Sequence, residues 1–149
     1  MTSEECAYLA GLLDGEGTIG ARVRKDGYLN LELGVCMTTP APLHWAQETT
    51  GSGGIYFRPE HRPNRQDAWF WKVGRMEEIA IILREVMPYL KVKREEAMLF
   101  LTLVEFRSMP RRMPAVERHL ADLISLHKRD RAAGLAGVSL LTAILPKAA

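Results

Sequence analysis

Residues 9–17 read LAGLLDGEG, a run of helix-forming residues that ends among glycines. A helix is predicted to begin near Thr2, because Thr2 and Glu5 have the three-residue spacing of a capping box. No proline interrupts this helix, and Gly15 and Gly17 are poor residues for continuing it. The stretch therefore predicts a helix that ends at its own glycines.

A two-stranded ribbon is predicted directly after the glycines, because the apolar period changes there to two residues. Residues 18–24 and 28–35 each place apolar side chains on one face and mostly polar side chains on the other. Between them, Lys25, Asp26 and Gly27 form a typical hairpin sequence. The ribbon therefore has one apolar face for a core and one polar face.

The remaining chain repeats this order and then becomes helical. A short helix is predicted over residues 38–50, strands over 55–58 and 68–73, and amphipathic helices from Arg75 onward. The order α-β-β-α-β-β-α predicts an α+β fold, with an antiparallel four-stranded sheet covered on one face by helices. The other sheet face is left polar and open to a partner.

The length of 149 residues suits a single domain. We expect residues 1–107 to form its αββαββα core and residues 108–149 to add C-terminal helices. Hydrophobic residues make up 47% and charged residues 26% of the chain, as in an ordinary folded protein. No apolar run reaches the ~20 residues that cross a membrane, which excludes a membrane-spanning protein.

The N-terminal segment lacks the basic region of a secretory signal. We therefore expect a protein that is not secreted, with a cytoplasmic (bacterial or phage) or organellar location. Cys6 and Cys36 stand among apolar residues, and two buried thiols are favoured over a disulfide.

The net charge of +2 is too small to identify a nucleic-acid partner, but the charges are unevenly distributed. Residues 1–17 hold four acids and no Lys or Arg, whereas residues 18–75 hold eight bases and five acids. An acidic segment beside a basic one suits a metal site next to a phosphate-binding surface. Scatter over a solvated surface is the alternative on charge alone.

The first helix carries small residues and, near its end, two acids. Ala7 and Gly11 share one face, and Ala10 lies on an adjoining face, so a second helix could approach closely. Tight packing inside one domain explains the small residues equally well. Asp14 and Glu16 stand where the helix dipole disfavours a carboxylate. A divalent cation would relieve this cost, and so would solvent exposure.

The stretch LAGLLDGEG resembles the signature of the LAGLIDADG homing endonuclease family. Leu13 for isoleucine, Gly15 for alanine and Glu16 for the second aspartate are small changes. The helix before the motif, the ribbon after it and the α-β-β-α-β-β-α order also match the family's fold. The later run LAGV, at residues 135–138, has no acid after it, so the chain carries a single motif.

The resemblance implies a homodimer with twofold symmetry, because single-motif members of the family act as homodimers. The motif helices of two copies would pack side by side at the twofold axis. The residues that the resemblance places at this interface are Ala7, Ala10, Gly11 and Asp14.

The resemblance also implies a metal site and a catalytic pair. In the family the acid at the position of Glu16 binds a divalent metal, with help from the backbone carbonyl of Gly15. Mg²⁺ is the expected cofactor, with Mn²⁺ as a substitute. The metal would support phosphodiester hydrolysis of two-metal type. Lys93, with Lys91 as its neighbour, would stabilise charge on the scissile phosphate.

The resemblance leaves one catalytic position in doubt. Near the end of the second strand the family often has Gln or Asn, which positions a metal-bound water. The matching residue here is Met37, which cannot do this. A hydroxyl group from Thr38 or Thr39 could substitute.

The polar face of the ribbons is the expected DNA-binding surface, because a two-stranded ribbon fits the major groove. Alternation in the second pair of strands directs Trp69 and Trp71 inward and Lys72 outward. The candidate DNA-binding residues are Arg22, Arg24, Tyr28, Asn30 and Glu32 from the first ribbon, and Tyr56, Arg58, Arg62, Arg65 and Lys72 from the second ribbon and its loop.

The sequence therefore predicts a Mg²⁺-dependent homing endonuclease that makes double-strand breaks in a long, roughly palindromic DNA target. We expect it to serve intron homing as an intron-encoded or free-standing enzyme. A cleavage-deficient relative that acts as an intron maturase or a DNA- or RNA-binding factor is the alternative. A small α+β dimer that uses the motif helix for assembly alone is the structural alternative.

Overall fold

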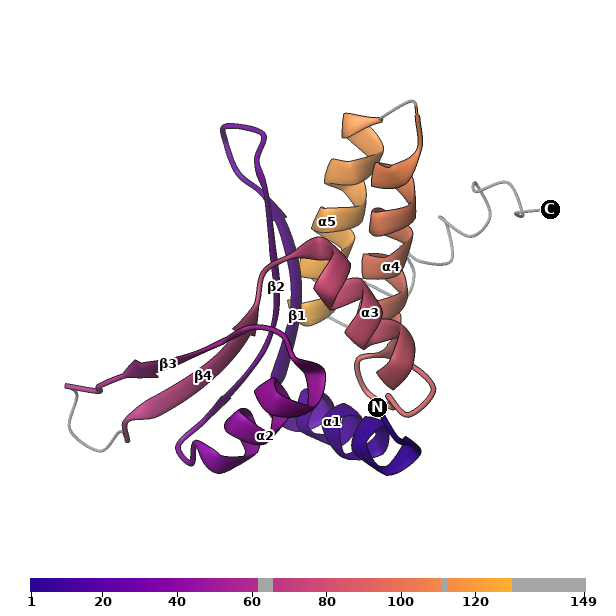
Figure 1. The fold of residues 1–149 in the computed structure, drawn as a ribbon. Coiled ribbons are helices and arrows are strands. Elements are labelled where there is room, and N and C mark those ends of the chain that lie inside the picture. The colour runs from indigo at the N-terminus through magenta and orange to yellow at the C-terminus, as the bar shows by residue number, and fades with distance from the viewer. Residues whose placement is uncertain (62–65, 111–112, 130–149) are drawn as a thin grey trace.

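The computed structural model describes residues 1–61, 66–110 and 113–129 (Figure 1). Within these residues the helices and strands follow the predicted order. They are α1 (Ser3–Glu16), β1 (Gly17–Val23), β2 (Leu29–Met37), α2 (Ala41–Thr50), β3 (Gly54–Arg58), β4 (Ala68–Val73), α3 (Met76–Val86), α4 (Arg94–Ser108) and α5 (Pro114–Arg129).

The four strands form one antiparallel sheet in the order β1-β2-β4-β3. Strands β1 and β2 are joined by the predicted hairpin, in which Gly27 has a φ of 80° that favours glycine. Gly34, in the middle of β2, lies where a Cβ would come 2.4 Å from the carbonyl oxygen of Trp71 in β4. Glycine at this position therefore allows the two central strands to approach.

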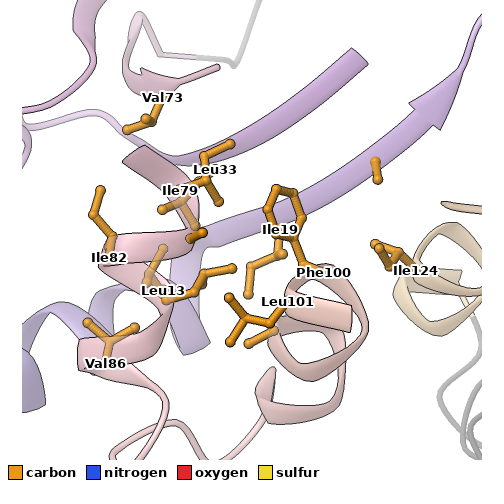
Figure 2. Packing of buried hydrophobic residues seen from close by; sticks show 14 of the residues in the cluster. Leu13, Ile19, Leu33, Val73, Ile79, Ile82, Val86, Phe100, Leu101 and Ile124 are labelled. Carbon is orange, nitrogen blue, oxygen red and sulfur yellow. The ribbon is translucent and has the colours of Figure 1, made fainter. Parts of the chain in front are cut away.

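The helices cover one face of the sheet, with α1, α3, α4 and α5 on the same side (Figure 1). Their apolar residues meet those of the strands in one core, part of which is drawn in Figure 2. Leu13 of α1, Ile19 of β1, Leu33 of β2 and Phe100 of α4 are all essentially inaccessible to solvent. The predicted α+β architecture is therefore confirmed.

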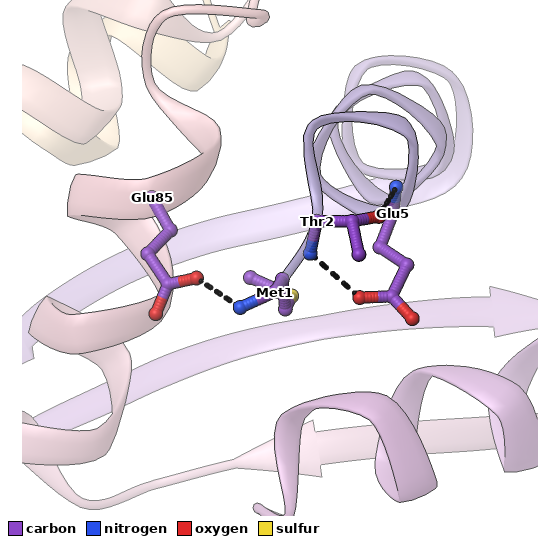
Figure 3. A network of polar contacts seen from close by, with 4 residues as sticks. All are labelled: Met1, Thr2, Glu5 and Glu85. Carbon is purple, nitrogen blue, oxygen red and sulfur yellow. Dashed lines mark hydrogen bonds and ion pairs between the residues drawn. The ribbon is translucent and has the colours of Figure 1, made fainter.

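Helix α1 begins as the sequence predicts. The Thr2 hydroxyl accepts from the backbone N–H of Glu5 at 3.2 Å, and the Glu5 carboxylate accepts from the backbone N–H of Thr2 at 2.8 Å. Figure 3 shows this capping box beside an ion pair of 2.8 Å between the Met1 amino group and Glu85 of α3. Hydrogen bonding to Glu85 raises the pKa of that amino group.

The inward direction predicted for the tryptophans is confirmed. Trp71 is fully buried, and its indole N–H donates to the carbonyl oxygen of Ser52 at 2.9 Å. Trp69 is partly buried and packs against Phe57, with 4.8 Å between the ring centroids. Lys72 is exposed, as predicted.

Both cysteines are free, as predicted, although they differ in burial. Cys6 is buried, and desolvation raises the pKa of its thiol. Cys36 is partly exposed. Among the described residues, no helix is long and apolar enough to cross a membrane.

One histidine has an unexpected setting. His127 of α5 is 1% exposed, and its Nδ1 lies 3.4 Å from Oε1 of Glu96 in α4, which is also buried. Within the part of the chain that the structure describes, the Nε2 atom of His127 has no hydrogen-bond partner. A buried histidine and a buried glutamate therefore face each other between α4 and α5.

Candidate nucleic-acid interface

The face of the sheet away from α1, α3, α4 and α5 carries the predicted polar side chains. The β1–β2 register places Arg22 opposite Asn30, and the β3–β4 register places Tyr56 opposite Phe70. Arg22, Asn30 and Tyr56 are exposed. The alternation read from the sequence therefore assigns these side chains to the correct face.

A groove runs over this face between the two ribbons. It brings together five of the predicted DNA-binding residues, although they come from three different strands. The groove is lined by Asn30, Leu31, Glu32, Tyr56, Phe57, Arg58, Phe70, Lys72, Val73 and Gly74.

The basic side chains on this face already have weak partners. The Lys72 Nζ atom lies 2.9 Å from Oε1 of Glu32, and both side chains are well exposed to solvent. The guanidinium of Arg58 lies over the ring of Phe70, 4.8 Å from its centroid. Exposed ion pairs contribute less than about 1 kcal/mol. An anionic ligand could therefore replace the carboxylate that Lys72 contacts.

The hairpin end of the ribbon carries two further predicted residues. Arg24 lies 5.9 Å from the ring centroid of Tyr28, and its guanidinium is 3.3 Å from the carboxylate of Asp26. These residues extend the polar face beyond the groove. The predicted Arg62 and Arg65, like the run at 135–138, lie outside the described residues.

Glu16 lies at the end of the sheet where β1 begins and β2 ends. It is the last residue of α1 and is exposed, and Gly17, which follows it, pairs with Val35 of β2. A small pocket is lined by Glu16, Cys36, Met37, Thr38 and Ala68. The acid of the motif therefore lies beside the ends of the two central strands, where the open face of the sheet begins.

The donor atoms at this place suit a hard divalent cation, but one chain supplies few of them. The Glu16 carboxylate and the Gly15 carbonyl are oxygen ligands of the kind that Mg²⁺ prefers. Among the described residues, no group of three His, Cys, Asp or Glu side chains could hold a metal ion. A single chain therefore offers part of a metal site.

Met37, Thr38 and Thr39 are the residues at the predicted water-positioning place. Met37 is partly buried, packs against the core and lines the pocket of Glu16. Thr38 lines the same pocket and Thr39 does not, although both residues are exposed. Of the two candidate hydroxyls, that of Thr38 is the better placed.

Lys93 is held at the end of α1. Its ammonium group donates to the backbone carbonyl oxygen of Asp14 at 2.6 Å. Asp14 is two residues before Glu16 in the sequence, so the Lys93 ammonium lies at the helix end that carries Glu16. Lys91 is exposed and reaches the same place through its backbone.

Two residues predicted at a helix-to-helix interface are used inside the chain. Ala10 is fully buried on the core side of α1, so its place in the interface is corrected. The carboxylate of Asp14 accepts backbone N–H groups of Lys91 at 2.7 Å and of Lys93 at 2.9 Å. Asp14 is therefore first of all an internal contact, which the sequence did not reveal.

The other two predicted interface residues lie on an adjoining, exposed face of α1. Ala7 and Gly11 are exposed, as is Gly15 one turn further along. A Cβ atom added at Gly11 or Gly15 would meet nothing within 4 Å. These three small residues, the α1 stripe, leave the backbone of the helix open to close approach.

Phe70 is one of the groove residues that sequence reasoning missed. The alternation that turns Trp69 and Trp71 inward also turns Phe70 outward, so the signal was present in the sequence. Its role as the surface under the Arg58 guanidinium depends on the β3–β4 register and had no sequence signal.

Comparisons with known proteins identify the fold. No family model and no curated protein sequence matches the chain. The structure of the homing endonuclease I-CvuI, in complex with a DNA target, has a TM-score of 0.67 and 25% sequence identity, and the match covers 83% of this chain and 81% of that one. The archaeal intron-encoded homing endonuclease I-Vdi141I, complexed with DNA, has a TM-score of 0.57 and 16% identity over 98% of this chain and 87% of that one.

A third structure is that of the LAGLIDADG homing endonuclease I-LtrWI bound to target DNA. Its TM-score is 0.56 and its identity 27%, over 69% of this chain and 37% of that one. The chain therefore has the LAGLIDADG homing endonuclease fold, as its sequence predicts. It spans most of I-CvuI, but only 36% of the LAGLIDADG meganuclease I-AabMI and 43% of I-GzeII.

Proposed function

We propose that this protein is a site-specific DNA endonuclease that works as a homodimer with Mg²⁺. The observation that carries the proposal is that Glu16 lines a pocket with Ala68, whose strand partner Arg58 lines the groove together with Asn30 and Lys72. One surface thus offers groups that bind DNA next to a carboxylate that can hold a metal. The solved relatives I-CvuI and I-Vdi141I were both crystallised with DNA, which supports this reading.

The groove suits duplex DNA in its dimensions and its chemistry. A strand of eight residues at ~3.3 Å per residue extends over roughly 26 Å, or about eight base pairs. Asn30 has the amide that can read adenine, and Arg22 and Arg58 have guanidinium groups that can read guanine or bind phosphate. Two copies related by twofold symmetry would read a long, roughly palindromic target.

The α1 stripe supports the homodimer. Its residues are open to solvent in the single chain, and close approach of two such helices would bring two copies of Glu16 together. The chain also covers less than half of I-AabMI and I-GzeII, so a second copy could supply what the longer chains contain.

The residues near the C-terminus of α1 have separate roles in the proposed reaction. Glu16 and the Gly15 carbonyl would hold Mg²⁺, which supplies an activated water and charge stabilisation when bound. Lys93 would offset the negative charge that develops on the scissile phosphate. Thr38, which lines the pocket of Glu16, would orient a water molecule in the absence of an amide at Met37.

The test is cleavage of a randomised duplex DNA library with Mg²⁺, by the wild-type protein and by Glu16→Gln. We expect the wild type to cut selected sequences. Glu16→Gln should bind them with a similar Kd but cut at least 100-fold more slowly, about the loss for a catalytic electrostatic group. Glu48→Gln, which removes an exposed carboxylate from α2, is the matched control. A Glu16→Gln protein that cuts like the wild type would refute the assigned role.

The homodimer is tested by Gly11→Leu. A leucine side chain has open space there within its own chain, so the protein should fold normally but no longer associate through α1. Ala115→Leu, at an exposed position of α5, is the control. Light scattering of the DNA complex should give two chains of 16.8 kDa for wild type and control. A wild-type complex with one chain would rule out the homodimer.

Met37 favours a second candidate function, that of a DNA- or RNA-binding factor or intron maturase that no longer cuts. The expected result in that case is a wild-type protein that enriches specific sequences without cleaving them. Met37→Gln, which installs an amide in the pocket of Glu16, should then gain measurable cleavage.

A further inference from the structure

The carboxylate of Asp14 joins two segments that are distant in the sequence. Its Oδ2 atom accepts the backbone N–H of Lys91 at 2.7 Å, and its Oδ1 atom accepts that of Lys93 at 2.9 Å. In return, the Lys93 ammonium group donates to the Asp14 carbonyl oxygen at 2.6 Å. We call these three hydrogen bonds the Asp14 clamp.

The clamp resolves an electrostatic conflict at the end of α1. A carboxylate near the C-terminus of its own helix is disfavoured by the helix dipole. The Asp14 carboxylate, however, lies at the N-terminus of α4, where Lys93 is the N-cap residue and provides no side-chain cap. A negative charge is favourable there, and the Lys93 ammonium is favourable at the C-terminus of α1. Each helix thus supplies the charge that the other helix end requires.

The geometry points to Asp14 as a positioning residue for Lys93. We propose that the clamp fixes the ammonium of Lys93 beside the helix end that carries Glu16, so that the acid and the base of the site are held as one unit. This inference rests on the proposed endonuclease function. It adds a role for Asp14 that involves neither contact with DNA nor a place in the dimer interface.

A flexible lysine gains most from such a contact. A lysine side chain has several rotatable bonds and samples many positions when it is exposed. With its backbone N–H fixed by one part of Asp14 and its ammonium group by another, Lys93 is held at both ends of its side chain. Such preorganisation raises the rate of a chemical step without tightening the binding of substrate.

The test is a double-mutant cycle with Asp14→Asn and Lys93→Met, on DNA that the wild type cuts. Asparagine has nearly the same shape as aspartate, but its amide nitrogen cannot accept the second N–H. We expect Asp14→Asn to lower the single-turnover cleavage rate on the order of 10- to 100-fold. Its Kd for DNA, measured with Ca²⁺, should stay within about twofold of wild type, because the effect lies in the chemical step.

The double variant separates positioning from a general loss of structure. If Asp14 acts through Lys93, Asp14→Asn together with Lys93→Met should be no slower than Lys93→Met alone. Asp122→Asn, an aspartate change at an exposed position of α5, is the matched control and should cut like the wild type.

A measurement that does not depend on cleavage completes the test. Amide hydrogen exchange at Lys91 and Lys93 should be faster in Asp14→Asn than in wild type, and unchanged in Asp122→Asn. Wild-type cleavage by Asp14→Asn, multiplicative effects of the two changes, or unchanged exchange would each overturn the positioning role. A wild-type protein that never cuts would instead overturn the endonuclease proposal, and the positioning role with it.

Discussion

The two ends of α1 are stabilised in opposite ways. At the N-terminus, Thr2 and Glu5 satisfy each other's backbone N–H groups across three residues. At the C-terminus, Asp14 reaches Lys91 and Lys93 across 77 and 79 residues. The capping box at the first end is a local structure that any chain with these residues can form, although the Met1 amino group beside it also contacts Glu85 of α3. The second end exists only in the complete fold, and it is the end that carries Glu16.

This difference explains which parts of the structure the sequence can predict. The capping box, the hairpin at Gly27 and the alternation of β1 and β2 depend on neighbouring residues, and all are found where the sequence places them. The fold follows from the order of these local elements. The sheet order and the β3–β4 register bring Arg58 onto Phe70, and no local pattern contains that information.

The candidate site divides in the same way. The position of Glu16 at a helix end could be predicted, because it depends on the glycines beside it. The partners of Asp14 could not, since two distant segments must fold before they meet. Ala10 was assigned to the wrong surface because Ala7, Ala10 and Gly11 are equally small. Which side of α1 is buried depends on how the helix packs against the sheet and α3.

The largest expected effect comes from removing the Asp14 side chain at the C-terminal end of α1. Asp14→Ala removes two hydrogen bonds to a charged group, each worth about 1.5–3 kcal/mol before solvent screening is considered. Because Asp14 is half-buried, we expect a loss of about 3 kcal/mol in the free energy of unfolding, measured by urea denaturation. A loss below about 1 kcal/mol would mean that the clamp contributes little to holding α1 and α4 together.

A paired substitution tests how tightly the same end is packed. A Cβ atom at Gly17 would lie 2.5 Å from the Cα atom of Leu13, whereas a Cβ atom at Gly15 would meet nothing within 4 Å. Gly17→Ala should therefore destabilise the chain by about 2 kcal/mol. Gly15→Ala should stabilise it by about 0.5 kcal/mol, because alanine is the better helix former. Thermal unfolding at low protein concentration distinguishes the two, and equal changes would contradict the structure.

The smallest effect on stability is expected at the N-terminal end of α1. Thr2→Ala removes the side-chain acceptor of the capping box and should cost about 1 kcal/mol of stability. Thr2→Ser, which keeps the hydroxyl, should restore most of it. Cleavage by Thr2→Ala should equal that of the wild type well below its Tm, because this end lies away from Glu16. A cleavage defect as large as that of Asp14→Asn would show that the two ends are not independent.

The Asp14 clamp also bears on the order in which the chain folds. The whole sheet lies in the sequence between Asp14 and Lys91, so the clamp closes a loop that contains all four strands. Contacts between residues so far apart form late, after the intervening chain has become ordered. The first turn of α1 can form early, whereas its last turn is completed only when the sheet is in place. A chain that has not finished folding therefore lacks the arrangement that holds Lys93 at the helix end that carries Glu16.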